Sequence, residues 1–301
     1  MYRCLELAKY GKGFVAPNPL VGAIIVYNRK IIGEGFHRKW GEAHAEVNAI
    51  NSVKNQELLR QSTLYVNLEP CSHYGKTPPC AKLIIEKKIP RVIIGQKDPF
   101  PQVAGRGIQL LKEAGIEVIT DVLRKEAENL NIRFTTFINK KRPYIILKWA
   151  QSADNYIDKI RMINDGQSPV KFSNEFTRSL GHKLRAEESA IIVGSNTFTL
   201  DNPQLNVRYW FGKNPVKIKA DKHQSLSDLM KELYEKKIQS LIVEGGSKLL
   251  QSFIDENLWD EARVEINTAL QLNGGVKAPN ITGNLEFVQK CKKSTILYYK
   301  N

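Results

Sequence analysis

Apolar residues in the first 140 positions come in short runs, separated by polar, glycine-rich or amphipathic segments. Runs rich in Val, Ile and Leu and bounded by turn residues predict strands, and they fall at 21–28, 30–36, 62–70, 91–99 and 116–122. Apolar residues at helical spacing, several times ended by glycine, predict helices around 5–8 and at 44–53, 80–88, 106–115 and 123–134. This alternation of strand and helix predicts an α/β layer sandwich.

The second half repeats the α/β character after a polar, basic joint, NKKRP, at 139–143. Buried strands are predicted at 143–154 and 261–270, a helix at 174–187, a strand that runs into a loop at 188–198, and a strand, glycine turn and helix at 240–255. Domains typically span about 100–200 residues. The chain of 301 residues is therefore expected to form two α/β domains, 1–142 and 143–301.

Composition adds little to this picture, since 42% hydrophobic and 25% charged residues are ordinary for a globular protein. The net charge of +14 comes from scattered lysines and arginines, without an arginine-rich arm or a basic run interleaved with aromatics. A solvated basic surface explains this charge, and attraction of phosphorylated small molecules is the functional alternative. We expect neither nucleic-acid nor membrane binding.

The cysteines point to metal chemistry. The amino-terminal MYRCLELAKYGKG lacks the apolar core of a signal peptide, and no run of 18 apolar residues occurs. The expected location is the cytoplasm, where thiols stay reduced and paired cysteines more often bind metal than each other.

The strongest candidate site combines His44, Cys71 and Cys80. Zinc favours imidazole and thiolate ligands, and a catalytic zinc site has three protein ligands with a fourth position open to water. Glu46, two residues after the histidine at a predicted helix start, can reach the open side without being a ligand. It can take a proton from the bound water and deliver it to a leaving nitrogen, which is the arrangement of zinc nucleobase deaminases.

The spacing of the two cysteines departs from the general deaminase motif. That motif has two residues between the cysteines, whereas here eight residues intervene, in CSHYGKTPPC. Glycine and proline in this segment suit a bulging turn. A structural zinc site remains the alternative, and it would need a fourth ligand, for which His73 is the nearby candidate.

Several long motifs resemble the bifunctional deaminase–reductase family of riboflavin biosynthesis, namely APNPLVGAIIV, GEAHAEV, LEPCSHYGKTPPC and KDPFPQVAGRG. The cysteine motif separates this family from cytidine and tRNA deaminases. The resemblance implies a cytidine-deaminase-like α/β/α sandwich that deaminates 2,5-diamino-6-ribosylamino-4(3H)-pyrimidinone 5′-phosphate. It also implies that this substrate is held by Asn18, His37, His73 and Lys76. Asp98 is a weaker candidate that also suits the capping of a turn.

The second half is similar to the reductase domain of the same family in ILKWAQSAD, LRAEESAIIVGSNTFTLDNPQLNVR and LIVEGGSKLLQSF. The resemblance implies a dihydrofolate-reductase-like α/β fold that uses NADPH to reduce the ribosyl group to ribityl. It assigns the substrate to Arg185, Leu205, Arg208 and Glu244, and NADPH to Ala150, Lys171, Thr197, Asp201, Gly245, Gly246 and Ser247. Glycines before a helix start let a phosphate approach free backbone N–H groups. The family also suggests a homodimer or homotetramer.

Two departures from the family affect the reductase half. Lys171 stands where the family usually has tryptophan, so a flat apolar face next to the cofactor is replaced by an amine. The chain is also several dozen residues short after Ile218, where the family has a strand and part of the cofactor floor. Either the chain has lost these residues or a stretch between Ile218 and Lys219 is omitted from the sequence.

Three hypotheses therefore remain, and two assays separate them. A bifunctional enzyme releases ammonia and consumes NADPH. A deaminase with a degenerate second domain releases ammonia only. A nucleic-acid deaminase, suggested by the charge alone, binds RNA in a strongly salt-dependent manner and leaves the reductase-like motifs unexplained.

Overall fold

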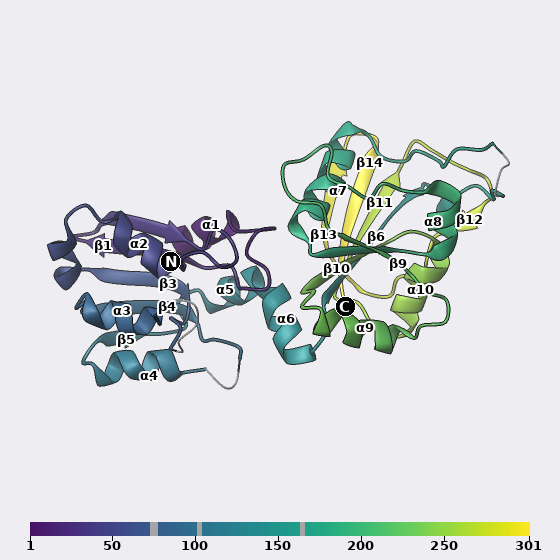
Figure 1. Cartoon of the computed structure of the whole chain (residues 1–301). Helices are drawn as coiled ribbons and strands as arrows, with labels where there is room; N and C mark the ends of the chain where they lie inside the picture. The colour runs from purple at the N-terminus through teal and green to yellow at the C-terminus, as the bar shows by residue number, and fades with distance from the viewer. Residues whose placement is uncertain (73–77, 101–103, 163–165) are drawn as a thin grey trace. The chain divides into compact units, whose positions relative to one another are not determined.

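The computed structural model describes residues 1–72, 78–100, 104–162 and 166–301. The chain divides into two compact units, Met1–Lys140 and Lys141–Asn301 (Figure 1), and this division falls two residues before the joint expected from the sequence. Each unit is described by itself. Across the described residues, no helix has both the length and the apolar character needed to cross a bilayer.

The first unit is built on one five-stranded sheet in the order β2-β1-β3-β4-β5. β1 runs antiparallel to β2 and β3, whereas β3, β4 and β5 run parallel. Its elements are α1 (Tyr2–Lys9), β1 (Gly22–Tyr27), β2 (Lys30–Phe36), α2 (Ala45–Ser52), the 3₁₀ helix η1 (Gln56–Gln61), β3 (Thr63–Leu68), α3 (Cys80–Glu86), β4 (Arg91–Gln96), α4 (Arg106–Glu113), β5 (Glu117–Ile119), α5 (Arg124–Leu130) and α6 (Ile132–Lys140).

Helices cover both faces of this sheet. The main core joins the buried faces of α2, α3 and α4 to alternate side chains of β1, β3 and β4. On the other face, Cys4 and Leu7 of α1 pack against Ile24 of β1, and α5 contacts β4. The expected α/β/α sandwich is therefore confirmed. The β1–β2 turn at Asn28 and Arg29 has positive φ at both positions, the conformation that a two-residue hairpin favours.

A close approach of α2 to the sheet sets the position of its first turn, where the candidate metal ligand lies. A Cβ atom added to Gly35 of β2 would stand 2.3 Å from the backbone nitrogen of Ala49 and 2.6 Å from the carbonyl oxygen of Ala45. Only glycine leaves room for this contact between strand and helix backbones.

The second unit has a seven-stranded sheet in the order β13-β14-β11-β6-β10-β8-β9, and a separate two-stranded ladder, β12-β7. The central strands are parallel, and β13, β14 and β11 form an antiparallel edge. Its elements are β6 (Tyr144–Ser152), β7 (Tyr156–Asp158), α7 (Glu175–Glu187), β8 (Ala190–Val193), α8 (Ser195–Asp201), β9 (Val216–Lys219), α9 (Leu226–Glu235), β10 (Ser240–Glu244), α10 (Ser247–Asp255), β11 (Glu261–Asn267), β12 (Val276–Lys277), β13 (Asn284–Cys291) and β14 (Ser294–Lys300).

The two faces of β6 have different roles. Ile145, Leu147 and Trp149 join the core that α9 and α10 form on one side of the sheet. Successive strand side chains point to opposite faces, so Lys148 and Ala150 face the other way, and both line a pocket with residues of α7. This sheet with helices on both faces confirms the expected reductase-like α/β fold.

Parts of the second unit differ from the sequence prediction. The loop expected after β8 is the short helix α8, and the strand expected to reach position 270 ends at Asn267. The hairpin β13–β14 was not predicted, because exposed β13 alternates weakly between polar and apolar residues. The strand β9 (Val216–Lys219) spans the expected break after Ile218 and pairs in parallel with β8 at the sheet edge.

Candidate functional site

Two loop–helix junctions and the loop after β3 bring the candidate metal ligands of the first unit together. His44 is the residue just before α2, Cys80 opens α3, and Cys71 follows β3 by three positions. Cys71 is tied to the start of α3 because its sulfur accepts the backbone N–H of Cys80 and its carbonyl oxygen accepts that of Ala81. Among residues 1–72, 78–100, 104–162 and 166–301, these are the three metal-ligating side chains whose ligand atoms lie within 4.8 Å of one another.

The separations fit a tetrahedral ion. The Nδ1 atom of His44 lies 3.4 Å from Sγ of Cys80 and 3.6 Å from Sγ of Cys71. Zinc bonds of about 2.05 Å to nitrogen and 2.3 Å to sulfur at tetrahedral angles place those atoms about 3.6 Å apart. His44 therefore offers Nδ1 as its ligand atom, and the donor set of one imidazole and two thiols suits zinc.

Electrostatics prepares the sulfurs for a cation. A hydrogen bond from the thiol of Cys80, followed by one from His44, lowers the pKa of Cys71 to about 4 against the opposing effect of burial. The same shared proton and burial raise the pKa of Cys80. The low pKa favours the thiolate form of Cys71 at neutral pH, and its sulfur accepts the backbone N–H of Cys80 at the start of α3, where the helix dipole favours negative charge.

Glu46 lies in the first turn of α2 and is 3% exposed. Burial and the nearby charge of Cys71 raise the pKa of its carboxyl group to about 7, against the opposing effect of His44. A carboxyl group with such a pKa can both accept and return a proton near neutral pH. The structure therefore places next to the three ligands a side chain suited to acid–base work.

Asn18 and His37 form a second layer beside the ligands. The His37 ring packs edge-on against His44 at 5.5 Å between centroids. Its Nδ1–H donates to the carbonyl oxygen of Ala43, so Nε2 is the acceptor for the amide Nδ2–H of Asn18. Burial lowers the pKa of His37, in keeping with a neutral ring. Both ring nitrogens are occupied, so His37 cannot be a fourth ligand, and it orients the Asn18 amide.

Two of the expected substrate residues, His73 and Lys76, lie outside the described residues. The prediction that His73 supplies a fourth zinc ligand therefore also concerns a residue outside the described ranges. Asp98 forms a local turn, since its Oδ1 accepts the N–H of Phe100, which matches the capping role considered for it.

Glu69, which the sequence does not single out, organises the loop that follows β4. Its buried carboxylate accepts four backbone N–H groups, from Asp98 and Gly105 on Oε2 and from Gly107 and Ile108 on Oε1. The loop and the first turn of α4 are thereby tied to the residue two positions before Cys71.

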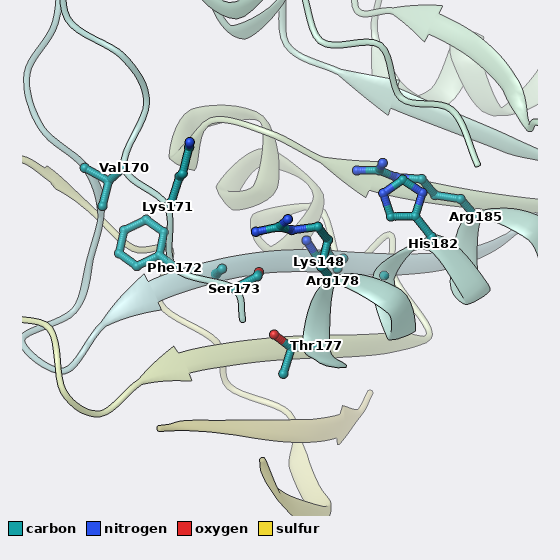
Figure 2. A pocket seen from close by; sticks show the side chains of 11 residues that line it. Lys148, Val170, Lys171, Phe172, Ser173, Thr177, Arg178, His182 and Arg185 are labelled. Atoms are coloured by element: carbon teal, nitrogen blue, oxygen red, sulfur yellow. The ribbon is translucent and has the colours of Figure 1, made fainter. Parts of the chain in front are cut away.

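The second unit contains a basic pocket of about 260 Å³ between β6, α7 and the segment 170–173. Figure 2 shows Lys148 and Arg178 near its middle, Lys171 and Phe172 on one side, and His182 with Arg185 on the other. The expected residues Ala150, Lys171 and Arg185 line it; Lys148, Val170, Phe172, Ser173, Thr177, Arg178, Gly181 and His182 were not predicted.

Two signals in the sequence could have indicated these residues. Arg178, His182 and Arg185 stand at i, i+4 and i+7 of one helix, which puts them on one face. Lys148 interrupts an otherwise apolar buried strand, and a buried charge needs a partner.

That partner is Glu244 at the end of β10. Its carboxylate accepts Lys148 Nζ–H at 2.9 Å and the Arg185 guanidinium at 2.9 and 3.1 Å. Burial opposes ionisation of Glu244, but the two cations outweigh burial and lower its pKa to about 2. Glu244 therefore stays charged and holds both cations at the pocket.

His182 lines the pocket and contacts the segment after α8. The backbone N–H of Arg208 donates to Nδ1 of His182 at 2.9 Å, and the Arg208 guanidinium donates to Gln204. Leu205 is buried, with positive φ. Burial and the charges of Arg185 and Arg208 lower the pKa of His182 to about 4. Arg185 and Arg208 are thus both close to His182.

Most of the expected cofactor residues form a separate cradle where α8 and α10 begin. Gly245 has φ of +146°, which only glycine adopts without strain, and the N–H of Gly246 donates to Oγ1 of Thr197. Gly246 caps α10 without a side-chain hydrogen bond, so the first-turn N–H groups from Ser247 onward suit the phosphates of a dinucleotide. Asp201, by contrast, is ion-paired with Arg161.

Two family models match the two units of the chain and define its class of protein. Residues 1–96 match the family model for the cytidine and deoxycytidylate deaminase zinc-binding region, and residues 143–227 and 223–300 match that for the RibD C-terminal domain. The chain is a zinc-binding deaminase domain joined to a reductase domain.

The relatives then define the family. The chain is 36% identical over 350 aligned positions to riboflavin biosynthesis protein RibD of Actinobacillus pleuropneumoniae, covering 100% of this chain and 90% of the relative. It is 38% identical to RibD of Aquifex aeolicus, covering 88% and 85%. The chain belongs to the RibD family, the bifunctional deaminase–reductases of riboflavin biosynthesis, which use zinc and NADPH.

A solved structure agrees over the whole chain. The diaminohydroxyphosphoribosylaminopyrimidine deaminase/5-amino-6-(5-phosphoribosylamino)uracil reductase of Thermotoga maritima has a TM-score of 0.89 at 34% identity, covering 100% of this chain and 97% of that one.

The comparisons also locate the shortening. The alignment with the Actinobacillus protein spans 350 positions, and 350 minus the 301 residues of this chain leaves at least 49 positions without a counterpart here. The match to the RibD C-terminal domain breaks into two pieces that overlap at 223–227, at the end of the β9–α9 connection and the start of α9, a few residues after Ile218.

Proposed function

We propose that the first unit deaminates diaminohydroxyphosphoribosylaminopyrimidine and that the second reduces its product, 5-amino-6-(5-phosphoribosylamino)uracil, with NADPH. These are the reactions named for the Thermotoga protein. The observation that carries the proposal is the convergence of His44, Cys71 and Cys80 beside the buried carboxyl group of Glu46.

In the first reaction, His44, Cys71 and Cys80 would hold zinc, which would lower the pKa of a bound water to about 7. Glu46 would accept a proton from the attacking water and return it to the leaving amino group. Asn18, oriented by His37, presents its carbonyl oxygen to the substrate. His73 and Lys76 are proposed to bind the substrate as well, Lys76 at its phosphate.

In the second reaction, the basic pocket binds the phosphoribosyl group. Arg185 and Arg208 are proposed to bind the phosphate, since a guanidinium can contact two oxygens at once, and Leu205 is proposed to contact the substrate as well. Glu244 keeps Lys148 and Arg185 in place. NADPH would supply the hydride. Gly245, Gly246 and Ser247, with Thr197 and Asp201, are proposed to hold its phosphates, and Ala150 and Lys171 are proposed to line its nicotinamide site.

The remaining proposals follow from this chemistry. Cys71 and Cys80 must stay reduced to bind metal, which favours the cytoplasm. We propose 142/143 as the functional domain boundary and a homodimer or homotetramer as the assembly.

One assay on the purified full chain tests the function. The pyrimidine phosphate is supplied with NADPH, and ammonia release and NADPH oxidation are followed separately. We expect both. Release of ammonia without NADPH oxidation would indicate a degenerate second domain, which the 49 unmatched positions make the alternative to test.

Glu46→Gln tests the proton transfer. Positioned acid–base groups contribute about 10²–10⁴-fold to rate, so we expect deamination to fall by that factor with zinc content unchanged. NADPH oxidation should also be unchanged when 5-amino-6-(5-phosphoribosylamino)uracil is supplied directly. Exposed Glu42 provides the matched control Glu42→Gln. Ammonia release by Glu46→Gln at the wild-type rate would contradict the assignment.

A further inference from the structure

His182 stands out in the reductase pocket because it is buried and polar, and because only one of its two ring nitrogens has a hydrogen-bond partner among the described residues. It lines the pocket from α7 and is 4% exposed, and Figure 2 shows its ring beside Arg185 at the edge of the basic cluster. None of the roles proposed above depends on it.

One ring nitrogen has a settled role. A backbone N–H can only donate, so the contact from Arg208 makes Nδ1 of His182 the acceptor. Tyr209, the next residue, packs edge-on against the ring at 4.9 Å between centroids. His182 thus fastens the segment after α8, which carries Arg208, to the pocket wall.

The other nitrogen is then a donor. The ring stays neutral because burial and the positive charges of Arg185 and Arg208 disfavour the imidazolium form, and neutral imidazole with an accepting Nδ1 carries its proton on Nε2. Within the described residues, no side chain or backbone group accepts this N–H. Nε2 is not among the fully buried side-chain atoms that lack a hydrogen-bond partner, so it keeps some solvent exposure, and the His182 side chain lines the pocket.

The surroundings define what this N–H can bind. The pocket wall around it carries the cations Lys148, Arg178 and Arg185, which attract an anionic ligand. A neutral N–H beside guanidinium groups adds a directional donor for an oxygen without adding repulsion among the cations. The group of the proposed substrate that fits is its phosphoribosyl moiety.

We propose that His182 is a substrate-positioning residue that uses both nitrogens: Nδ1 holds the backbone of Arg208, and Nε2–H binds an oxygen of the phosphoribosyl group. This inference rests on the proposed function of the pocket. It adds a donor to that site and links it to the placement of Arg208.

Two variants separate the two nitrogens. In His182→Asn, the side-chain oxygen lies about where Nδ1 was and can still accept the Arg208 N–H, but the donor is lost. In His182→Gln, the amide reaches the position of Nε2 and can still donate, but the acceptor for Arg208 is lost. His182→Leu removes both, and Lys183→Gln, on the neighbouring residue that does not line the pocket, is the control.

The readout is steady-state NADPH oxidation with the phosphoribosylaminouracil. Loss of one hydrogen bond corresponds to about a tenfold change, so we expect KM to rise about tenfold in His182→Asn and in His182→Gln and further in His182→Leu, with kcat changed little. Hydrogen exchange of the Arg208 amide should be faster in the Gln and Leu variants than in the Asn variant. A merely structural role would not produce this split.

Ribose 5-phosphate as a competitive inhibitor tests the ligand group, and its inhibition constant should rise with KM in His182→Asn. An unchanged inhibition constant would overturn the assignment to the phosphoribosyl group. If KM in His182→Leu equals that of the wild type while Arg185→Ala raises it, the inference fails and the proposed function stands. If wild-type protein does not oxidise NADPH, the proposed function of the pocket itself fails.

Discussion

Replacing Glu69 by glutamine tests the carboxylate that accepts four backbone N–H groups in the first unit. The side chain keeps its size, so packing is unchanged, but one carboxylate oxygen becomes an NH₂ group. That group then faces two of the four backbone N–H donors that the carboxylate satisfies. These donors lie in the loop after β4 and at the start of α4.

The cost follows from the hydrogen bonds lost. Bonds to a charged group contribute about 1.5–3 kcal/mol each, so the loss of two predicts a fall of about 4 kcal/mol in the free energy of unfolding. Domains are stable by about 5–15 kcal/mol, so this is a large fraction. For a unit of this size, about 4 °C per kcal/mol gives a Tm lower by about 15 °C.

The measurement is thermal unfolding of the zinc-loaded full chain by circular dichroism and by loss of deaminase activity. Glu86→Gln, an exposed glutamate on α3, is the control and should change Tm by no more than a degree or two. If Glu69→Gln has the same Tm as the control, the hydrogen bonds of the loop amides to this carboxylate do not contribute to stability, and the reasoning is wrong.

Two further predictions concern the ligands and the buried ion pairs. Cys80→Ser should lose zinc on dialysis, measured by metal analysis, whereas Cys4→Ser, buried outside the site, should retain it; equal zinc in both would remove Cys80 from the ligand set. Glu244 has a pKa lowered from 4.5 to about 2, so its contribution of about 3 kcal/mol is complete above pH 4.5 and is lost as pH falls towards 2. Glu244→Gln should therefore flatten the loss of stability between pH 4.5 and 2, followed by tryptophan fluorescence, and an unaltered acid transition would contradict the ion-pair assignment.

The metal site could be predicted because its chemistry is local in sequence. HAE and PC place ligands at junctions between strands, loops and helices, and only a few residue types bind zinc. The separations of Nδ1 of His44 from both sulfurs are what such a site requires. Glu69 gave no comparable signal, since its partners are backbone amides between 29 and 39 residues away, and any sequence could supply backbone amides.

The reductase pocket was predicted in part. Arg185 and Glu244 came from resemblance, but Lys148, which completes their ion-paired cluster, is a lysine within an apolar strand and was not assigned. The role of His182 could not be predicted, because a single histidine on a helix does not indicate a binding site until the position of the segment that contacts it is known. That segment reaches it from 26 residues further along the chain, a contact that periodicity does not reveal.

The shortening of the second unit should affect its proposed NADPH binding more than its proposed substrate binding. The proposed substrate pocket is formed by β6 and α7, with Glu244 of β10 behind them. None of these elements contains the break at 223–227, and their ion pairs are intact. The proposed cofactor residues Gly245 and Thr197 lie at the starts of α10 and α8, and β9, the strand beside β8 at the sheet edge, ends four residues before the break. The chain should therefore bind the phosphoribosyl substrate with its full set of cations, and any weakening relative to other family members should be seen in NADPH affinity.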